Sequence, residues 1–85
     1  MANLKKTGKK YRVKRRYQPY TKLMCWMREN GITQQDLADL LGKSRHAINR
    51  NLNGVSGDFS MDEVRKICLH YGISADAFFI EQKVS

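Results

Sequence analysis

Residues 32–54, with the sequence ITQQDLADLLGKSRHAINRNLNG, decide the fold of this chain. Thr33 followed three positions later by Asp36 forms the capping-box pattern that starts a helix. The helix that follows covers residues 34–41, and its apolar residues recur at helical spacing: Leu37, Ala38, Leu40 and Leu41. A tight connection at Gly42 leads to Ser44, which caps a second helix running to about residue 53. The stretch therefore predicts two helices joined by a short turn.

The flanking segments continue the helical pattern. Residues 20–30 place four apolar side chains on one helical face: Tyr20, Leu23, Trp26 and Met27. Ser60 and Glu63 repeat the capping box before a helix over 61–71, whose inward residues are Val64, Ile67, Cys68 and Tyr71. Ser74 caps a short helix over about 75–80, which offers the core Phe78 and either Ile80 or Phe79. The sequence predicts an all-α domain of five helices over residues 20–85.

The helix after Ser44 has one apolar face and one polar face. Ala47, Ile48 and Leu52 share the apolar sector. Asn51 falls inside this sector, so it needs a hydrogen-bond partner or a place at its edge. The polar face has no acid, and its residues are Arg45, His46, Asn49, Arg50 and Asn53. Arginine pairs with guanine and asparagine with adenine, whereas a face that only needs solvation more often pairs Glu with Lys. The polar face therefore favours nucleic-acid readout.

The first part of the chain carries the whole net charge. The chain has 85 residues and a formal net charge of +8, which allows one small domain and favours polyanionic partners. Residues 1–20 hold eight cations and no acid, and Tyr11, Tyr17 and Tyr20 lie among them, where they can stack on bases. We expect a basic arm over residues 1–19 that is disordered alone. Its predicted nucleic-acid contacts are Lys9, Lys10, Arg12, Lys14, Arg15, Arg16 and Tyr17. The alternative is a solvated tail that aids solubility.

Other classes of function find little support in the sequence. The longest apolar run, residues 77–80, has four residues, so we expect neither a membrane span nor a secretory signal. No Gly-rich phosphate loop and no paired acids are present, so we predict no enzyme activity, no catalytic residue and no cofactor. Cys25, on an exposed face, and Cys68, on a core face, lack the spacing of a zinc site. His46 has no local nucleophile or carboxylate, and Leu69 is a weak candidate for a dimer contact.

Residues 32–54 resemble the helix-turn-helix of the Cro/cI-like (XRE) DNA-binding domains of phage and bacterial regulators. The later stretch DFSMDEVRKICLHYGISADAFF, residues 58–79, resembles the fourth and fifth helices of that family. The resemblance covers about residues 20–80 without gaps and leaves the arm outside. The residues that match at the family's spacing are Thr33-Gln34, Leu37-Ala38, Gly42, Ser44, Ile48, Gly54 and Gly72-Ile73-Ser74. A compact lambda-repressor-like fold and a phage or mobile-element regulator are implied.

The resemblance also implies how DNA would be bound. The helix after Ser44 would enter the major groove with its N-terminal residues on base edges. At matching positions, the base-reading residues would be Arg45, His46, Asn49 and Arg50, and the phosphate contacts Gln34, Lys43, Ser44 and Asn53. Family members commonly bind palindromic sites as dimers, so a homodimer is expected, formed through the domain itself or only on DNA. A cytoplasmic, nucleoid-associated protein of a bacterial or phage-infected cell is implied.

One position pair departs from the family. Many members pair an arginine late in the first helix with a glutamate late in the third, and the matching residues here are Met27 and Leu52. Both ends are apolar together, so we expect packing in place of an ion pair. Such an exchange is often neutral or stabilising.

Three functions stay open from the sequence. The first is a sequence-specific, repressor-like transcriptional regulator, in which helix 44–53 specifies the site and the arm adds phosphate or minor-groove contacts. The second is a small protein-binding inhibitor or adaptor built on a helix-turn-helix scaffold. The third is RNA binding through the arm. Only the first explains the acid-free face of helix 44–53, and we predict that function.

Overall fold

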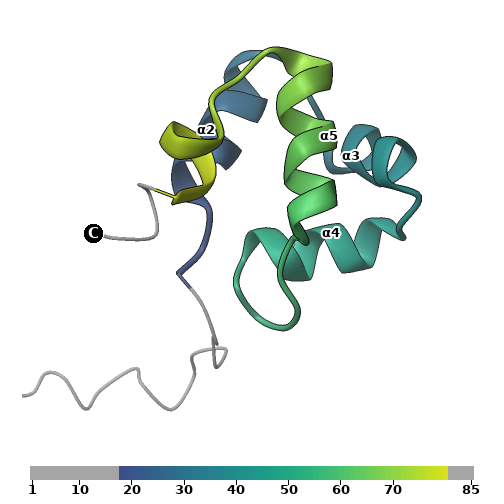
Figure 1. Ribbon diagram of the computed structural model, residues 1–85. Helices are drawn as coiled ribbons and strands as arrows, with labels where there is room; N and C mark the ends of the chain where they lie inside the picture. The colour runs from purple at the N-terminus through teal and green to yellow at the C-terminus, as the bar shows by residue number, and fades with distance from the viewer. Residues whose placement is uncertain (1–17, 81–85) are drawn as a thin grey trace, which may run out of the picture.

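The computed structural model describes residues 18–80, so the predicted contacts of the arm lie outside the described residues. Its elements in chain order are α2 (Thr21–Glu29), α3 (Gln34–Leu41), α4 (Arg45–Leu52), α5 (Met61–Tyr71) and η2 (Asp76–Ile80), which is a π-helical turn. Over residues 18–80, the prediction of an all-α domain of five helices is confirmed (Figure 1).

Side-chain caps lie at the starts of α3, α4 and α5 and just before η2, at the residues that the sequence predicts. Thr33 and Ser60 each accept a hydrogen bond from the backbone N–H of the acid three positions later, and each acid accepts one from the backbone N–H of the cap. Ser44 and Ser74 also accept from the backbone N–H three residues on, at 3.0 and 3.2 Å. Such a cap is worth about 1 kcal/mol, so these starts are well determined.

Glycine ends two of the helices. Gly42 after α3 and Gly72 after α5 have φ angles of 69° and 67°, in the left-handed region that other residues adopt at a cost. At Gly42 this conformation turns the chain directly into the cap of α4. The short connection brings α3 and α4 against each other as the two helices of one motif.

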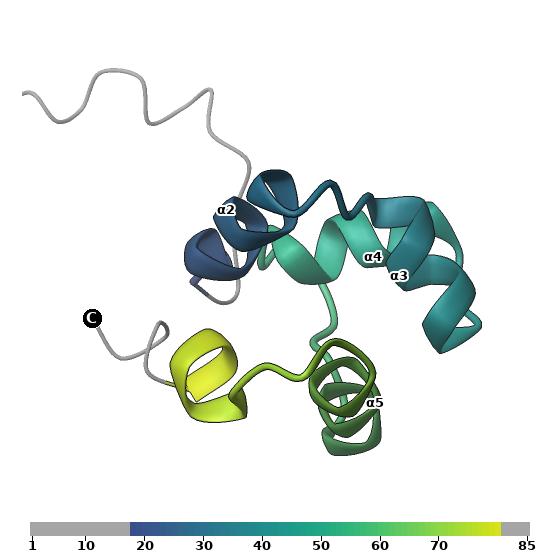
Figure 2. The same ribbon diagram turned by 90° about the horizontal axis from the view of Figure 1, so that it is seen from above.

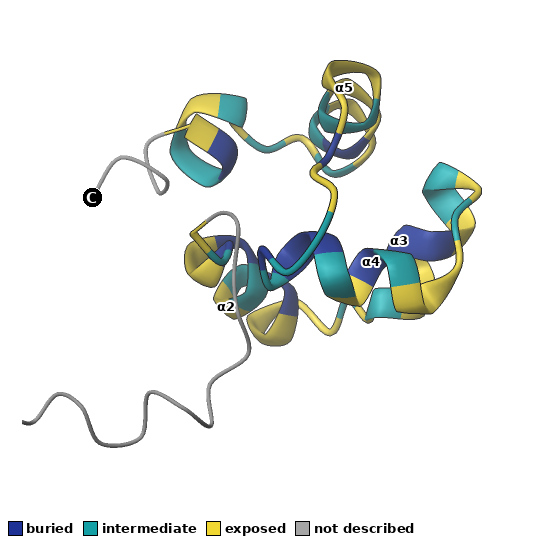
Figure 3. Cartoon of the chain, turned by 90° about the horizontal axis from the view of Figure 1, so that it is seen from below, coloured by how far each residue is buried: buried dark blue, intermediate teal, exposed yellow. Residues whose placement is uncertain are grey.

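The core lies between two layers. Figure 2 shows α2, α3 and α4 on one side and α5 with η2 on the other. Helix α3 packs against both α4 and α5, and η2 packs against α2. In Figure 3 the buried parts of the helices face the space between the layers. The largest fully buried side chains there are Leu23, Leu37, Ile48, Leu52 and Ile67.

Tyr20 is part of this core and not of a DNA-binding arm. Its ring is 3% exposed and lies 5.5 Å from the rings of both Phe59 and Phe79. Its hydroxyl donates to Asp58 Oδ1 at 2.6 Å, and its backbone N–H donates to the carbonyl of Leu52 at 2.8 Å. The prediction that Tyr20 belongs to the apolar face of residues 20–30 is therefore confirmed. Its packed ring is not available to stack on bases, so the grouping of Tyr20 with the stacking tyrosines is wrong.

The last helix differs in form from the prediction. The sequence predicts an ordinary short helix over 75–80, whereas Asp76–Ile80 is one π-helical turn. Phe79 is 5% exposed and packs edge-on against Phe59 at 5.8 Å, while Ile80 is 54% exposed. Of the two residues proposed for the core, Phe79 is therefore the one that is buried. Contacts among aromatic rings stabilise this placement.

Met27 and Leu52 are both in the apolar core, as the sequence predicts for this departure from the family. Their side chains are 4% and 0% exposed, and both belong to one cluster of buried residues. Among residues 18–80 no ion pair occupies this position. Met27 and Leu52 therefore contribute to stability through burial of apolar surface.

Candidate nucleic-acid interface

Helix α4 presents its polar face to solvent. Ile48 and Leu52 are fully buried against the other helices, which turns the opposite side of α4 outward. Arg45, His46 and Asn49 are exposed, and Arg50 is half-buried. The division of this helix into two faces is confirmed, and three of the four predicted base-reading side chains are open to solvent.

Acidic side chains lie on another side of the motif. Asp36 and Asp39 on α3 line a pocket of about 320 Å³ together with Leu40, His70 and Tyr71. There, burial and the nearby charge of Asp36 raise the pKa of the Tyr71 hydroxyl. Helix α4 itself contains no acid, so a polyanion that approaches its exposed face meets cations and amides.

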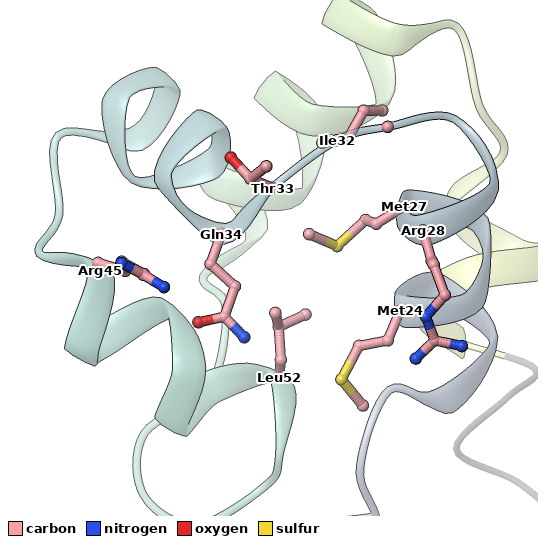
Figure 4. Close-up of a pocket in the computed structure, with 9 residues that line it drawn as sticks. Met24, Met27, Arg28, Ile32, Thr33, Gln34, Arg45 and Leu52 are labelled. Carbon is pink, nitrogen blue, oxygen red and sulfur yellow. The ribbon is translucent and has the colours of Figure 1, made fainter.

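A pocket of about 470 Å³ lies beside α4, between α2 and the start of α3 (Figure 4). Its apolar lining comes from Met24, Met27, Ile32 and Leu52. Figure 4 shows the guanidinium groups of Arg28 and Arg45 on opposite sides of the pocket, with the amide of Gln34 between them. Asn49 Nδ2 also donates to Gln34 Oε1, at 3.4 Å. The fold thus brings a predicted phosphate contact next to two predicted base-reading residues.

Arg28 is a candidate that the sequence reasoning missed. It is exposed in the last turn of α2 and forms no ion pair with any residue between 18 and 80. The available signal was a cation in the last turn before the loop that leads to Gln34. Its place beside Gln34 and Arg45 depends on how α2 lies against α4, which the local sequence does not give.

Ser44 and Asn53 lie at opposite ends of α4. Ser44 is exposed, and its hydroxyl oxygen accepts from Ala47 N–H, which leaves the hydroxyl hydrogen for another acceptor. Asn53 is half-buried at the C-terminal end, where its amide donates to the carbonyl of Asn49 at 2.9 Å. The two predicted phosphate contacts therefore bracket the exposed face.

Lys43 points into the domain. Its ammonium donates to Asn51 Oδ1 and to Glu63 Oε1, the latter at 3.1 Å, and lies 5.4 Å from the centre of the Phe59 ring. Its side chain is 21% exposed. Asn51 is buried and also donates to the carbonyl of Ser56 at 3.3 Å, so the expectation that it needs a partner is confirmed. Lys43 was predicted as a phosphate contact, and the structure instead gives its ammonium internal partners.

Comparison with known protein families identifies the domain. A model of a helix-turn-helix family, HTH_3, matches residues 26–78, more than half of the chain. The chain belongs to this helix-turn-helix family. No curated protein and no solved structure matches it in the corresponding searches.

The match covers the parts of the fold just described. It extends from Trp26 in α2 to Phe78 in η2 and contains all of α3, α4 and α5. The resemblance to Cro/cI-like (XRE) domains is confirmed at the level of the family. A helix-turn-helix domain of this family binds DNA and is typical of non-enzymatic regulators, so the partner of this chain is DNA.

The two cysteines lie outside α4, on α2 and α5. Cys25 is exposed and Cys68 is half-buried, as predicted, and burial raises the pKa of the Cys68 thiol. Within residues 18–80, no three His, Cys, Asp or Glu side chains are grouped so as to hold a metal ion. No helix in that range is long and apolar enough to cross a lipid bilayer.

Proposed function

We propose that this protein is a sequence-specific transcriptional regulator of the repressor type, from a phage or mobile element, and that α4 reads the major groove. One observation carries the proposal: the exposed face of α4 holds cations and amides without an acid, inside a helix-turn-helix domain. The adaptor and RNA-binding alternatives give that face no role.

The base-reading residues in this proposal are Arg45, His46, Asn49 and Arg50. The two guanidinium groups suit the N7 and O6 acceptors of guanine, and the amide of Asn49 suits adenine. Each good bidentate pair discriminates against a wrong base by about 1–3 kcal/mol. Specificity would therefore rest on a few residues of one helix.

The phosphate contacts in this proposal are Gln34, Ser44 and Asn53, and Arg28 is added to them because it faces Gln34 across the pocket. Such contacts fix the register of the domain on the duplex without reading sequence. Lys43 would have to leave Asn51 and Glu63 to reach a phosphate, so we assign it a role in supporting the motif.

The arm and the dimer belong to the same proposal. The arm residues predicted to contact nucleic acid would add affinity that does not depend on base sequence. A homodimer, formed through the domain or only on DNA, would place one α4 in each half of a palindromic site. Such a regulator would act at the nucleoid.

Selection of binding sites from random duplex DNA tests the proposal, followed by binding assays with variants of the full chain. Arg45→Ala and Asn49→Ala should each weaken the selected site by about 1–3 kcal/mol and relax preference at particular bases. Arg65→Ala is a matched control, because Arg65 is an exposed arginine on α5, paired with Asp62 at 2.9 Å. No enriched site, or equal losses for Arg45→Ala and Arg65→Ala, would refute readout by α4.

The arm is tested without shortening the chain. Changing Arg12, Lys14, Arg15 and Arg16 to glutamine should weaken selected and random DNA almost equally. The slope of log K against log salt is negative, and each phosphate contact that is lost should make it less steep by about 0.9. An unchanged slope would remove the arm from the DNA interface.

A further inference from the structure

We infer that the loop after α4 fixes the guanidinium of Arg50 for base reading, with Ser56 as the positioning residue and Asn51 as its support. The inference rests on the proposed role of Arg50 and adds a specificity-determining residue outside the helix. Ser56 lies in the connection between α4 and α5.

The contact between Arg50 and Ser56 is direct and oriented. Arg50 Nε donates to Ser56 Oγ at 2.7 Å, and both side chains are partly buried. Five N–H bonds of a guanidinium are arranged in a fixed plane, so holding the Nε–H sets the direction of the rest. The end formed by Nη1 and Nη2 is then the part left for a bidentate pair with guanine.

His46 borders the same guanidinium from within α4. Arg50 Nη1 lies 3.4 Å from His46 Nε2, one helical turn away. Nη1 carries two hydrogens, so this contact still leaves one hydrogen for DNA. The Arg50 side chain is thus held between a hydroxyl of the loop and a ring of the helix.

Ser56 is itself tied to the core. Its carbonyl accepts from Asn51 Nδ2 at 3.3 Å, and Asn51 is only 5% exposed. Asn51 Oδ1 accepts from Lys43, whose ammonium also donates to Glu63 at the start of α5. The polar contacts therefore run without a break from α5 to the guanidinium.

The shape of the loop depends on the same contacts. Gly57, next to Ser56, has a φ angle of 68°, and a Cβ added there would lie 3.1 Å from Asn51 Nδ2. A side chain at this position would press on the amide that holds Ser56. Holding a side chain in its bound conformation reduces the ordering cost on binding, which is the benefit we assign to this arrangement.

The test measures discrimination, which is the ratio of the affinities of the full chain for the selected site and for the same site with one base pair changed. The changed base pair is the one at which Arg50→Ala relaxes the preference. Ser56→Ala removes the acceptor and should lower discrimination at that base pair by about 2–10-fold. Ser56→Thr keeps a hydroxyl and should preserve most of the discrimination. Arg50→Lys keeps the charge but has no Nε–H, so it should also lose discrimination. None of the Ser56 variants should change the salt slope, because no phosphate contact is removed.

A double-variant cycle separates positioning from direct contact. If Ser56 acts through Arg50, Ser56→Ala should have no further effect in the Arg50→Ala background. An equal loss in both backgrounds would mean that Ser56 contacts DNA itself and would overturn the inference. Discrimination retained in Ser56→Ala but lost in Arg50→Ala would also overturn it while leaving the proposed function intact. If the Arg50→Ala variant keeps the base preferences of the parent at every position, the proposed role of Arg50 in base reading is refuted instead.

Discussion

Leu52→Glu is expected to unfold the domain, because Leu52 is fully buried among apolar side chains in α4. Losing the burial of a leucine costs about 1.5–3 kcal/mol. An unpaired charge at a buried position costs about 3–5 kcal/mol more. Small domains are stable by about 5–15 kcal/mol, mostly toward the lower end, so the sum approaches the whole free energy of unfolding.

Thermal unfolding followed by far-ultraviolet circular dichroism measures this effect. Leu69→Glu is the matched control, since Leu69 is 83% exposed and the same substitution should leave the Tm nearly unchanged. A second variant adds Met27→Arg to Leu52→Glu and restores the ion pair that many Cro/cI-like proteins have at these positions. The double variant should be more stable than Leu52→Glu alone, because the buried carboxylate gains a partner.

Two results would refute the reasoning. A Tm for Leu52→Glu equal to that of the parent would show that the position tolerates a charge and is not buried in solution. Equal destabilisation by Leu52→Glu and Leu69→Glu would show that the effect comes from the added charge and not from its place. Failure of the double variant to recover stability would count only against the proposed geometry of the restored pair.

Three further predictions concern stability. Ser60→Ala removes the cap of α5 and should lower the free energy of unfolding by about 1 kcal/mol in urea titrations, with the m-value unchanged. The raised pKa of Tyr71 means that the folded chain holds the hydroxyl proton more tightly than the unfolded chain. The free energy of unfolding should therefore fall as the pH rises above 10.0, the ordinary pKa of tyrosine, and Tyr71→Phe should lessen this fall in alkaline urea titrations. Gly42→Ala should cost about 1–2 kcal/mol because of its positive φ angle alone, whereas Gly57→Ala also meets Asn51 at 3.1 Å and should lower the Tm further; equal Tm values would show that the loop yields freely.

Local sequence patterns predicted the helices well because the contacts that start and stop them are local. The cap of α3 joins Thr33 to Asp36, and the cap of α5 joins Ser60 to Glu63, each across three positions. The apolar spacing likewise predicted which side of α4 is buried. The helix starts and the buried side of α4 could therefore be predicted from the sequence, because both depend on residues within about one helical turn.

Contacts between distant residues explain what the sequence did not give. Tyr20 was predicted on the apolar face of the first helix and was also grouped with the tyrosines that can stack on bases; its hydroxyl bonds to Asp58, 38 positions later, a partner that no local pattern indicates. Lys43 was predicted as a phosphate contact, but its ammonium pairs with Glu63, 20 positions later. The π-helical turn at Asp76–Ile80 coincides with the packing of Phe79 against other aromatic rings, which no pattern within that turn reveals.

The sequence predicted only part of the candidate interface, because part of it depends on local spacing and part on how the helices pack. Exposure of Arg45, His46 and Asn49 follows from the position of each on α4. The contact of Gln34 with Asn49 depends on how α3 lies against α4. The place of Arg28 in the pocket that Gln34 also lines depends on how α2 lies against these two helices. The exposure of side chains on one helix follows the helical period of the sequence, whereas contacts between different helices do not.

One carboxylate oxygen has a consequence for the cooperativity of unfolding. Glu63 Oε1 accepts from the backbone N–H of Ser60 at 2.9 Å and from the ammonium of Lys43 at 3.1 Å. The start of α5 and the turn between α3 and α4 therefore share one acceptor atom. Amide hydrogen exchange should show these segments opening together as one unit. A graft of residues 32–54 onto another scaffold would lose this support, so the module that can be transplanted with its DNA-reading geometry extends at least through the first turn of α5.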